Sequence, residues 1–112
     1  MKEVIIDGIV YVPKKTNNEN PYVLVRTYSA GVFCGYLKSR NGQEVKLSEA
    51  RRLWYWSGAA TLSQLAIEGV KNPEGCKFPE EVEEILLLQA IEIIPMTETA
   101  KKSVKDVQAW KA

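Results

Sequence analysis

The sequence predicts an α+β fold, a small, mostly antiparallel sheet or half-barrel with two short helices. Short β-branched and aromatic runs recur along the chain, strong turn signals separate them, and two segments have helical capping signals. The chain has 112 residues, of which 46% are hydrophobic, so one domain can bury a real core. We expect a single domain over residues 1–112, with an N-terminal hairpin at 2–13, a core at 22–95 and a C-terminal helix and tail at 97–112.

The strand predictions rest on turn residues between apolar runs. Asp7-Gly8 predicts a hairpin near the N-terminus, and Arg40-Asn41-Gly42 predicts a second hairpin. Residues 14–20 are polar and predict a loop. Gly35 lies inside a strand pattern, which indicates a bulge or the close approach of another backbone. The expected strands are residues 4–6, 9–12, 22–28, 32–37, 44–47, 51–56, 85–88 and 90–94, and the last two are expected to be buried.

Two helices are predicted from their caps. Thr61-Leu62-Ser63-Gln64 has the form of a capping box, so a helix is expected over 61–68, ending at Gly69. Thr97 is expected to cap a second helix over 98–107. The lone Trp110 that follows is expected to dock, on its own chain or on a neighbour.

Composition excludes several function classes. The net charge of +1 argues against a duplex-DNA binder, which usually carries a basic excess. The chain has no histidine, which removes the usual general base and the commonest metal ligand. Cys34 and Cys76 form no CxxC pattern, so we expect no metal site and no cofactor; we expect buried free thiols, with a disulfide as the alternative. No signal peptide or membrane-spanning run is visible, so a soluble, cytoplasmic protein is expected.

The strongest functional signal is the stretch from Arg51 to Ser57, in which two arginines precede three consecutive aromatics and a Ser-Gly pair. Alternation in a strand places Arg52, Trp54 and Trp56 on one face. Guanidinium groups bind phosphate and flat rings stack on bases, so this face suits a nucleotide. The competing interpretation is that the aromatics fill a core while the arginines reach solvent, and the sequence does not tell which face is buried.

A second candidate anion site spans the end of the strand at 22–28 and the turn that follows it. Arg26, Thr27 and Ser29 bring a guanidinium and hydroxyls beside exposed turn amides, although an ordinary hairpin has the same composition. Thr97 and Thr99 are weaker candidates, because a capped surface helix explains them as well. The ligand-binding candidates are therefore Arg26, Thr27, Ser29, Arg52, Trp54, Trp56, Ser57, Thr97 and Thr99.

No catalytic constellation is found. The glutamates at 80–84 suit a solvated acidic edge better than an acid–base pair, because no catalytic partner accompanies them. Cys34 lacks a histidine that would activate it as a nucleophile. We therefore expect a binding protein and no enzyme.

Three segments resemble a small family of phage and prophage proteins. They are residues 25–32 (VRTYSAGV), residues 50–59 (ARRLWYWSGA) and residues 90–95 (AIEIIP) with the following Thr97-Glu98 and the near-terminal tryptophan. The resemblance covers about residues 22–111 and leaves the hairpin at 2–13 outside. This family is similar to the first-described Thoeris anti-defence sponge family.

The resemblance implies a function. Sponges of that kind bind cyclic ADP-ribose isomers made by bacterial TIR-domain proteins and withhold them from the downstream effector, which is a form of immune evasion. Some members also take up cyclic oligonucleotide signals of CBASS immunity. The family assembles from dimers into a hexamer. By this resemblance the chain is expected to be a homo-oligomer in the cytoplasm of an infected bacterium, with a cyclic nucleotide signal as its partner.

Three other interpretations remain open. Strand-borne aromatics and arginines also suit a module that binds single-stranded nucleic acid. The aromatics could instead be subunit contacts of a structural phage protein. A phosphodiesterase acting on such signals would need a metal or an acid–base pair, and the sequence offers neither.

Overall fold

The computed structural model describes residues 4–6, 9–11 and 20–111, with side chains from residue 20 onward. The predicted Asp7-Gly8 turn and nearly all of the predicted loop at 14–20 lie outside the described residues. The elements in chain order are β1 (Val4–Ile6), β2 (Ile9–Tyr11), β3 (Tyr22–Thr27), β4 (Val32–Asn41), β5 (Glu44–Leu53), α1 (Leu62–Glu68), a short 3-10 helix (Pro73–Gly75), β6 (Val82–Leu87), β7 (Ala90–Pro95) and α2 (Glu98–Asp106).

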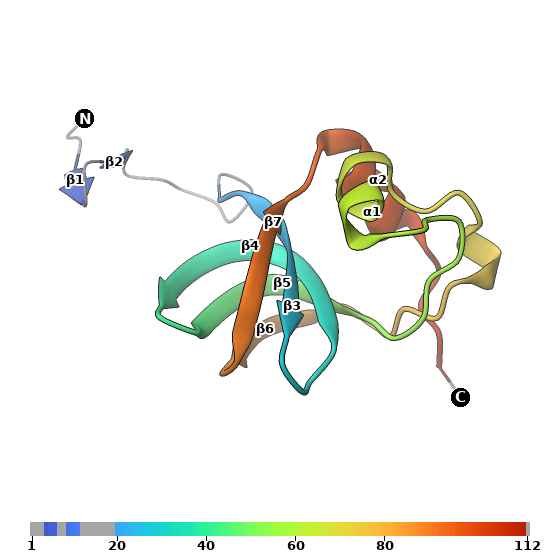
Figure 1. Cartoon of the computed structure of the whole chain (residues 1–112), viewed down its shortest axis with the longest axis horizontal. Helices are drawn as coiled ribbons and strands as arrows, with labels where there is room; N and C mark the ends of the chain where they lie inside the picture. The colour runs from blue at the N-terminus through green and yellow to red at the C-terminus, as the bar shows by residue number, and fades with distance from the viewer. Residues whose placement is uncertain (1–3, 7–8, 12–19, 112) are drawn as a thin grey trace.

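The main sheet has five antiparallel strands in the order β6-β5-β4-β3-β7, and β1 pairs separately with β2. The two edge strands, β6 and β7, are joined directly through Leu88 and Gln89, so the sheet has to curl (Figure 1). Two backbone hydrogen bonds hold the curl, from Tyr28 N to Gln89 O at 2.9 Å and from Ala90 N to Gln43 O at 3.0 Å. The result is an open half-barrel with two helices, which confirms the predicted α+β class.

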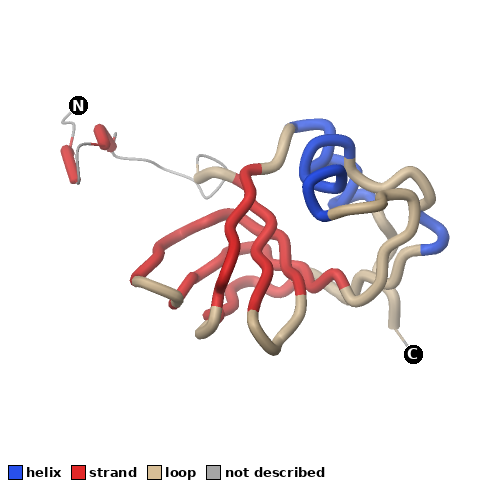
Figure 2. The backbone as a smooth tube through the Cα atoms, in the orientation of Figure 1, coloured by secondary structure: helices blue, strands red, loops and turns tan. Residues whose placement is uncertain are grey.

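Each face of the curled sheet has its own core, because side chains alternate along each strand. The two helices gather on one side of the sheet (Figure 2), where Leu65 and Val104 are fully buried against Leu24 and Cys34. The opposite face forms the inner core of the half-barrel, which consists of Val23, Val25, Phe33, Val45, Leu47, Ala50, Leu87 and Ala90.

Three glycines lie where the sequence predicted turns or the close approach of another backbone. Gly31 and Gly42 have φ angles of 100° and 63° in the β3–β4 and β4–β5 turns, a region that favours glycine. A Cβ on Gly35 would lie 3.0 Å from the Ser48 carbonyl oxygen, and the β4–β5 register shifts beside it. The close backbone approach predicted for Gly35 is confirmed.

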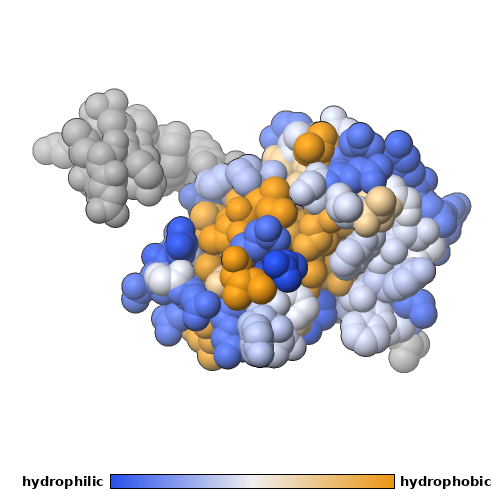
Figure 3. Space-filling model, in the orientation of Figure 1, coloured by the Kyte–Doolittle hydropathy of each residue, from blue (hydrophilic) through white to orange (hydrophobic). Residues whose placement is uncertain are grey.

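The prediction that residues 85–88 and 90–94 form buried strands is wrong. Leu87 and Ala90 belong to the inner core, but no residue of β6 joins the core beneath the helices, and β7 reaches that core only through the partly buried Ile94. Leu86, Leu88 and Ile91 are 51%, 61% and 44% exposed, respectively. Apolar surface is visible over β7 on the face shown in Figure 3.

β5 also differs from the prediction. Residues 48–50 were expected to separate two strands, but the strand runs through them, and Glu49 adopts a φ of 49° beside a register shift. The predicted strand at 51–56 ends early, since β5 stops at Leu53. Beyond that point Tyr55 makes an isolated bridge to Lys77.

The helix caps follow the sequence closely. The Thr61 side chain accepts a hydrogen bond from Gln64 N, and α1 ends at Gly69, which has a φ of 78°. The Gln64 side chain accepts from Ala60 N at 2.8 Å, one residue before the position that a capping box requires. Thr97 caps α2 in the same way, by accepting from Ala100 N.

Candidate functional site

A surface hollow of about 400 Å³ lies where the β3–β4 turn meets the end of β5. Four predicted site residues line it together, although they come from two separate stretches of sequence. The pairing of Val32 with Leu53 and of Phe33 with Arg52 brings these stretches side by side. The lining residues are Ser29, Ala30, Gly31, Val32, Arg52, Leu53, Trp54 and Trp56.

Arg52 faces solvent because the alternation of β5 buries its two neighbours, Arg51 and Leu53. Its guanidinium lies 4.5 Å from the centroid of the Phe33 ring, and its Nη1 donates to the Ala30 carbonyl oxygen at 2.9 Å. Within residues 20–111, no carboxylate lies within ion-pair distance of Arg52. A guanidinium has five N–H donors, so Arg52 keeps donors that an anion can use.

The two tryptophans of the hollow differ in burial. Trp56 packs against the core beneath the helices and forms part of the wall. Trp54 is 62% exposed, because the chain leaves the sheet after Leu53 and no strand covers the ring. An exposed indole beside an arginine offers a stacking surface next to a phosphate donor.

Trp110 is a residue of this region that was not among the site candidates. Its ring centroid lies 6.4 Å from that of Trp54, and the two ring planes differ by 6°. The expectation that Trp110 docks is confirmed, and it docks on its own chain. In the sequence, Trp110 is a lone aromatic residue in a polar tail, which indicates that its ring packs against something but does not identify the residue that it packs against.

Arg26 and Thr27 lie outside this hollow. Arg26 Nε donates to Glu92 Oε1 at 3.1 Å across the β3–β7 pair, so its charge is already balanced. Thr27 is buried, and its hydroxyl donates to Gly31 O at 2.7 Å and accepts from Ala30 N at 2.9 Å. Thr27 therefore shapes the turn that presents Ser29.

Ser57 makes contacts within the loop that follows the aromatics. Its hydroxyl accepts from Asn72 Nδ2 at 3.1 Å, and its N–H donates to Cys76 Sγ at 3.4 Å. These bonds hold the 57–58 segment against the 71–76 segment. Ser57 does not line the Arg52 hollow.

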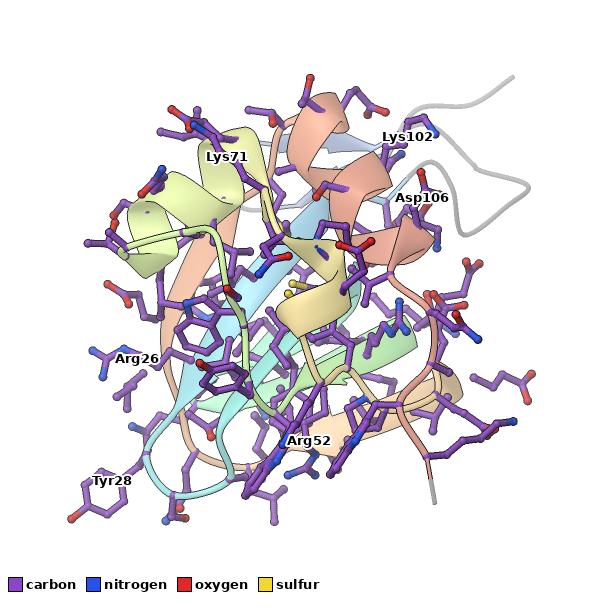
Figure 4. All side chains as sticks on the ribbon, turned by 90° about the vertical axis from the view of Figure 1, so that its right-hand side faces the viewer. Arg26, Tyr28, Arg52, Lys71, Lys102 and Asp106 are labelled. Carbon is purple, nitrogen blue, oxygen red and sulfur yellow. The ribbon has the colours of Figure 1, made fainter. Side chains whose placement is uncertain are left out.

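Thr97 and Thr99 belong to the helical side of the molecule. Besides capping α2, the Thr97 hydroxyl donates to the Ile67 carbonyl oxygen at 2.7 Å, which ties α2 to α1. Figure 4 shows Arg52 at the end of the molecule opposite Lys102 of α2. Neither threonine lines the Arg52 hollow, so the structure does not bring these two candidates together with the others.

A second hollow, of about 390 Å³, adjoins the first and shares Ser29, Ala30 and Arg52 with it. Thr27 also lines it, and its other wall is apolar and comes from β6 and the β6–β7 connection, including Leu86 and Leu88. The Ser29 hydroxyl donates to Gln89 Oε1 at 2.8 Å, so the β3–β4 turn is held to this connection. Arg52 therefore stands between an aromatic hollow and an apolar one.

The buried neighbour Arg51 has a different role. It donates to three backbone oxygens, those of Pro79 at 2.9 Å, Val104 at 2.8 Å and Phe78 at 3.2 Å. Burial lowers its pKa, and the nearby Glu81 opposes that shift. Arg51 fixes the 78–79 segment and the end of α2 behind the site.

Among the described residues, no cluster of three or more histidine, cysteine, aspartate or glutamate side chains is placed to hold a metal ion. In the same part of the chain, no helix combines the length and the apolar character needed to cross a membrane. Neither a curated protein nor a solved structure matches the chain. A family model, the domain of unknown function DUF6948, matches residues 20–104, and the chain therefore belongs to this family.

Proposed function

We propose that this protein binds a small nucleotide signal, holds it without cleaving it, and so withholds it from an effector. The observation that carries the proposal is the hollow in which Arg52 keeps free donors beside the exposed ring of Trp54. A guanidinium pairs with phosphate, and an indole stacks on a base. The Ser29 hydroxyl donates to Gln89 Oε1 at 2.8 Å, so it holds the turn beside the guanidinium in place.

The identity of the signal rests on the sequence resemblance. The proposed ligand is a cyclic ADP-ribose isomer of Thoeris immunity, and cyclic oligonucleotides of CBASS are a further candidate. The protein would act as an anti-defence sponge in the cytoplasm of a phage-infected bacterium. A homo-oligomer belongs to the same proposal, because a second subunit can complete an open, shallow nucleotide site.

The first experiment tests capture and release. The protein is incubated with lysate from cells whose TIR-domain protein is active, freed of small molecules by filtration, and then heat-denatured. We expect an intact cyclic ADP-ribose isomer only in the denatured fraction. A signal that stays free throughout would contradict the proposal, and a degraded signal would show an enzymatic activity.

Variants test the site in the same assay. Arg52→Ala and Trp54→Ala are each expected to weaken binding about tenfold or more, since a charge-assisted hydrogen bond or a base stack is lost. Tyr28→Ala is the control, because Tyr28 is 77% exposed and lines neither hollow. Folded Arg52 and Trp54 variants that bind as well as the parent would disprove this site.

A structural or interaction protein is the second candidate function. The exposed Leu86 of β6 and Leu88 of the β6–β7 connection favour it, because large exposed apolar groups at sheet edges are typical of subunit contacts. A stable assembly with no affinity for any nucleotide would support this alternative. Affinity that rises with oligonucleotide length and falls steeply with salt would instead support single-stranded nucleic-acid binding.

A further inference from the structure

The tail at residues 107–111 lies against the back of the candidate site. Trp110 N donates to the Phe78 carbonyl oxygen at 2.9 Å, and Lys111 Nζ pairs with Glu80 Oε2 at 3.2 Å. The Lys77 ammonium lies 5.5 Å from the centroid of the Trp110 ring. The tail is therefore attached to the 77–80 segment by backbone and side-chain contacts.

The same 77–80 segment also holds the chain around Trp54. Trp54 N and Tyr55 N both donate to the Lys77 carbonyl oxygen, at 3.1 and 3.2 Å, and Lys77 N donates to Tyr55 O at 2.7 Å. Trp54 and Trp110 are thus carried by two segments on one shared support. This arrangement explains why their rings are nearly parallel although 56 positions separate them in the sequence.

The two rings have different surroundings. Trp54 lines the hollow that contains Arg52, whereas Trp110 does not. Trp110 instead lines a separate hollow with Pro73, Cys76 and Asp106. Trp110 therefore contacts Trp54 without entering the site where the proposed ligand would lie.

We propose that Trp110 is a positioning residue, which holds the Trp54 indole in place so that a nucleobase can stack on it. This inference rests on the proposed function and names a part of the chain beyond residues 20–104, the range that the family model covers. A 62% exposed ring has few other contacts to restrict its rotamer. Stacking on Trp110 orders that ring before the ligand arrives, which lowers the entropy lost on binding.

The test is a double-mutant cycle on the affinity for a cyclic ADP-ribose isomer, measured by calorimetry with the full chain. Trp110→Ala is expected to weaken binding about two- to tenfold, the range that corresponds to one aromatic pair. In a Trp54→Ala background, Trp110→Ala should have no further effect, because the ring that it positions is gone. Trp110→Phe should restore most of the affinity.

Controls separate positioning from folding. Trp110→Leu keeps apolar volume without an aromatic face, and it should bind as weakly as Trp110→Ala while melting near the parent temperature. Lys71→Ala removes an exposed ion pair with Glu68 outside this region and should leave affinity unchanged. These two variants keep the test decisive if Trp110→Ala proves unstable.

Each outcome has a distinct meaning. If the parent binds the isomer and Trp110→Ala and Trp110→Leu bind equally well, the positioning role is overturned and the proposed function stands. If Trp110→Ala still weakens binding in the Trp54→Ala background, Trp110 acts on the ligand directly and the inference is likewise overturned. If the parent binds no isomer, the proposed function fails, and the inference fails with it.

Discussion

Arg51 and Arg52 are adjacent residues with opposite roles, because successive side chains of β5 point to opposite faces. Arg51 is 4% exposed and gives its hydrogen bonds to three backbone carbonyl oxygens. Arg52 is exposed and makes one such bond, to Ala30. A shift of one position along β5 thus separates an arginine with a structural role from an arginine that is a candidate ligand contact.

This difference predicts a large contrast in stability. Arg51→Leu should lower the free energy of unfolding by about 3 kcal/mol or more, since it removes three hydrogen bonds from a charged group to backbone carbonyl oxygens. Arg52→Leu should cost less than about 1 kcal/mol, because it removes an exposed contact with Phe33 and one exposed hydrogen bond. Urea denaturation of both variants measures the contrast, and equal losses would contradict the assigned roles.

Alkaline pH should destabilise the fold through two buried acids. Burial raises the pKa of Cys34 above its ordinary value of 9.0, and it raises the pKa of Tyr22 above 10.0. As the pH rises, the unfolded chain therefore loses these protons at a lower pH than the folded chain does. The free energy of unfolding is unaffected by these groups below about pH 9 and falls as the pH rises further. The hydroxyl of Tyr22 has no hydrogen-bond partner among the described residues.

The matched test is Tyr22→Phe, followed by denaturation from pH 7 to pH 11. We expect the variant to lose less stability than the parent between pH 9 and pH 11. A parent whose unfolding free energy stays constant over that interval would refute the expectation, as would identical slopes for the two proteins.

At the scale of elements, α2 allows a direct test of one weak site candidate. Thr97→Ala should lower the free energy of unfolding by about 1 to 2 kcal/mol, because it removes both the α2 cap and the bond to Ile67 O in α1. Thr99→Ala is the control and should change stability by less than about 0.5 kcal/mol, since Thr99 is exposed. Thermal melting and ligand affinity are measured together. If Thr97→Ala lowers ligand affinity by more than its loss of stability accounts for, Thr97 belongs to the binding site.

The helix boundaries could be predicted from the sequence because caps are local. Thr61 and Gly69 delimit α1 through their own backbone geometry, and no distant residue is needed to place them. The edge strands could not be predicted in the same way. The apolar run at 85–88 has the composition of a buried strand, but burial depends on what packs against each face, and no residue of β6 belongs to the core beneath the helices.

At the scale of the whole molecule, the sequence predicted four of the residues that line the candidate hollow, but it did not predict how the fold brings them together. Ser29 and Arg52 line the same hollow because β4 pairs with β5. The register of that pair starts at the turn that contains Gly42, ten residues before Arg52. Strand alternation predicted Arg52, Trp54 and Trp56 on one face; all three line the hollow, but the strand ends at Leu53 and Trp56 also packs against the core beneath the helices. The stacking of Trp110 on Trp54 could not be predicted from the sequence, because it depends on how the 77–80 segment holds the tail beside Trp54.

The order of the strands also has a consequence for synthesis on the ribosome. β3 pairs on one side with β4, its neighbour in sequence, and on the other side with β7. In the β3–β7 pair, Arg26 donates a hydrogen bond to Glu92, which is 66 residues further along the chain. Until the ribosome has released residues 90–95, β3 is therefore a nascent edge with exposed hydrogen-bonding groups. Closure of such a distant pair is slow compared with local hairpin formation. The growing chain is accordingly most vulnerable to aggregation during the interval between the completion of β4 and the arrival of β7.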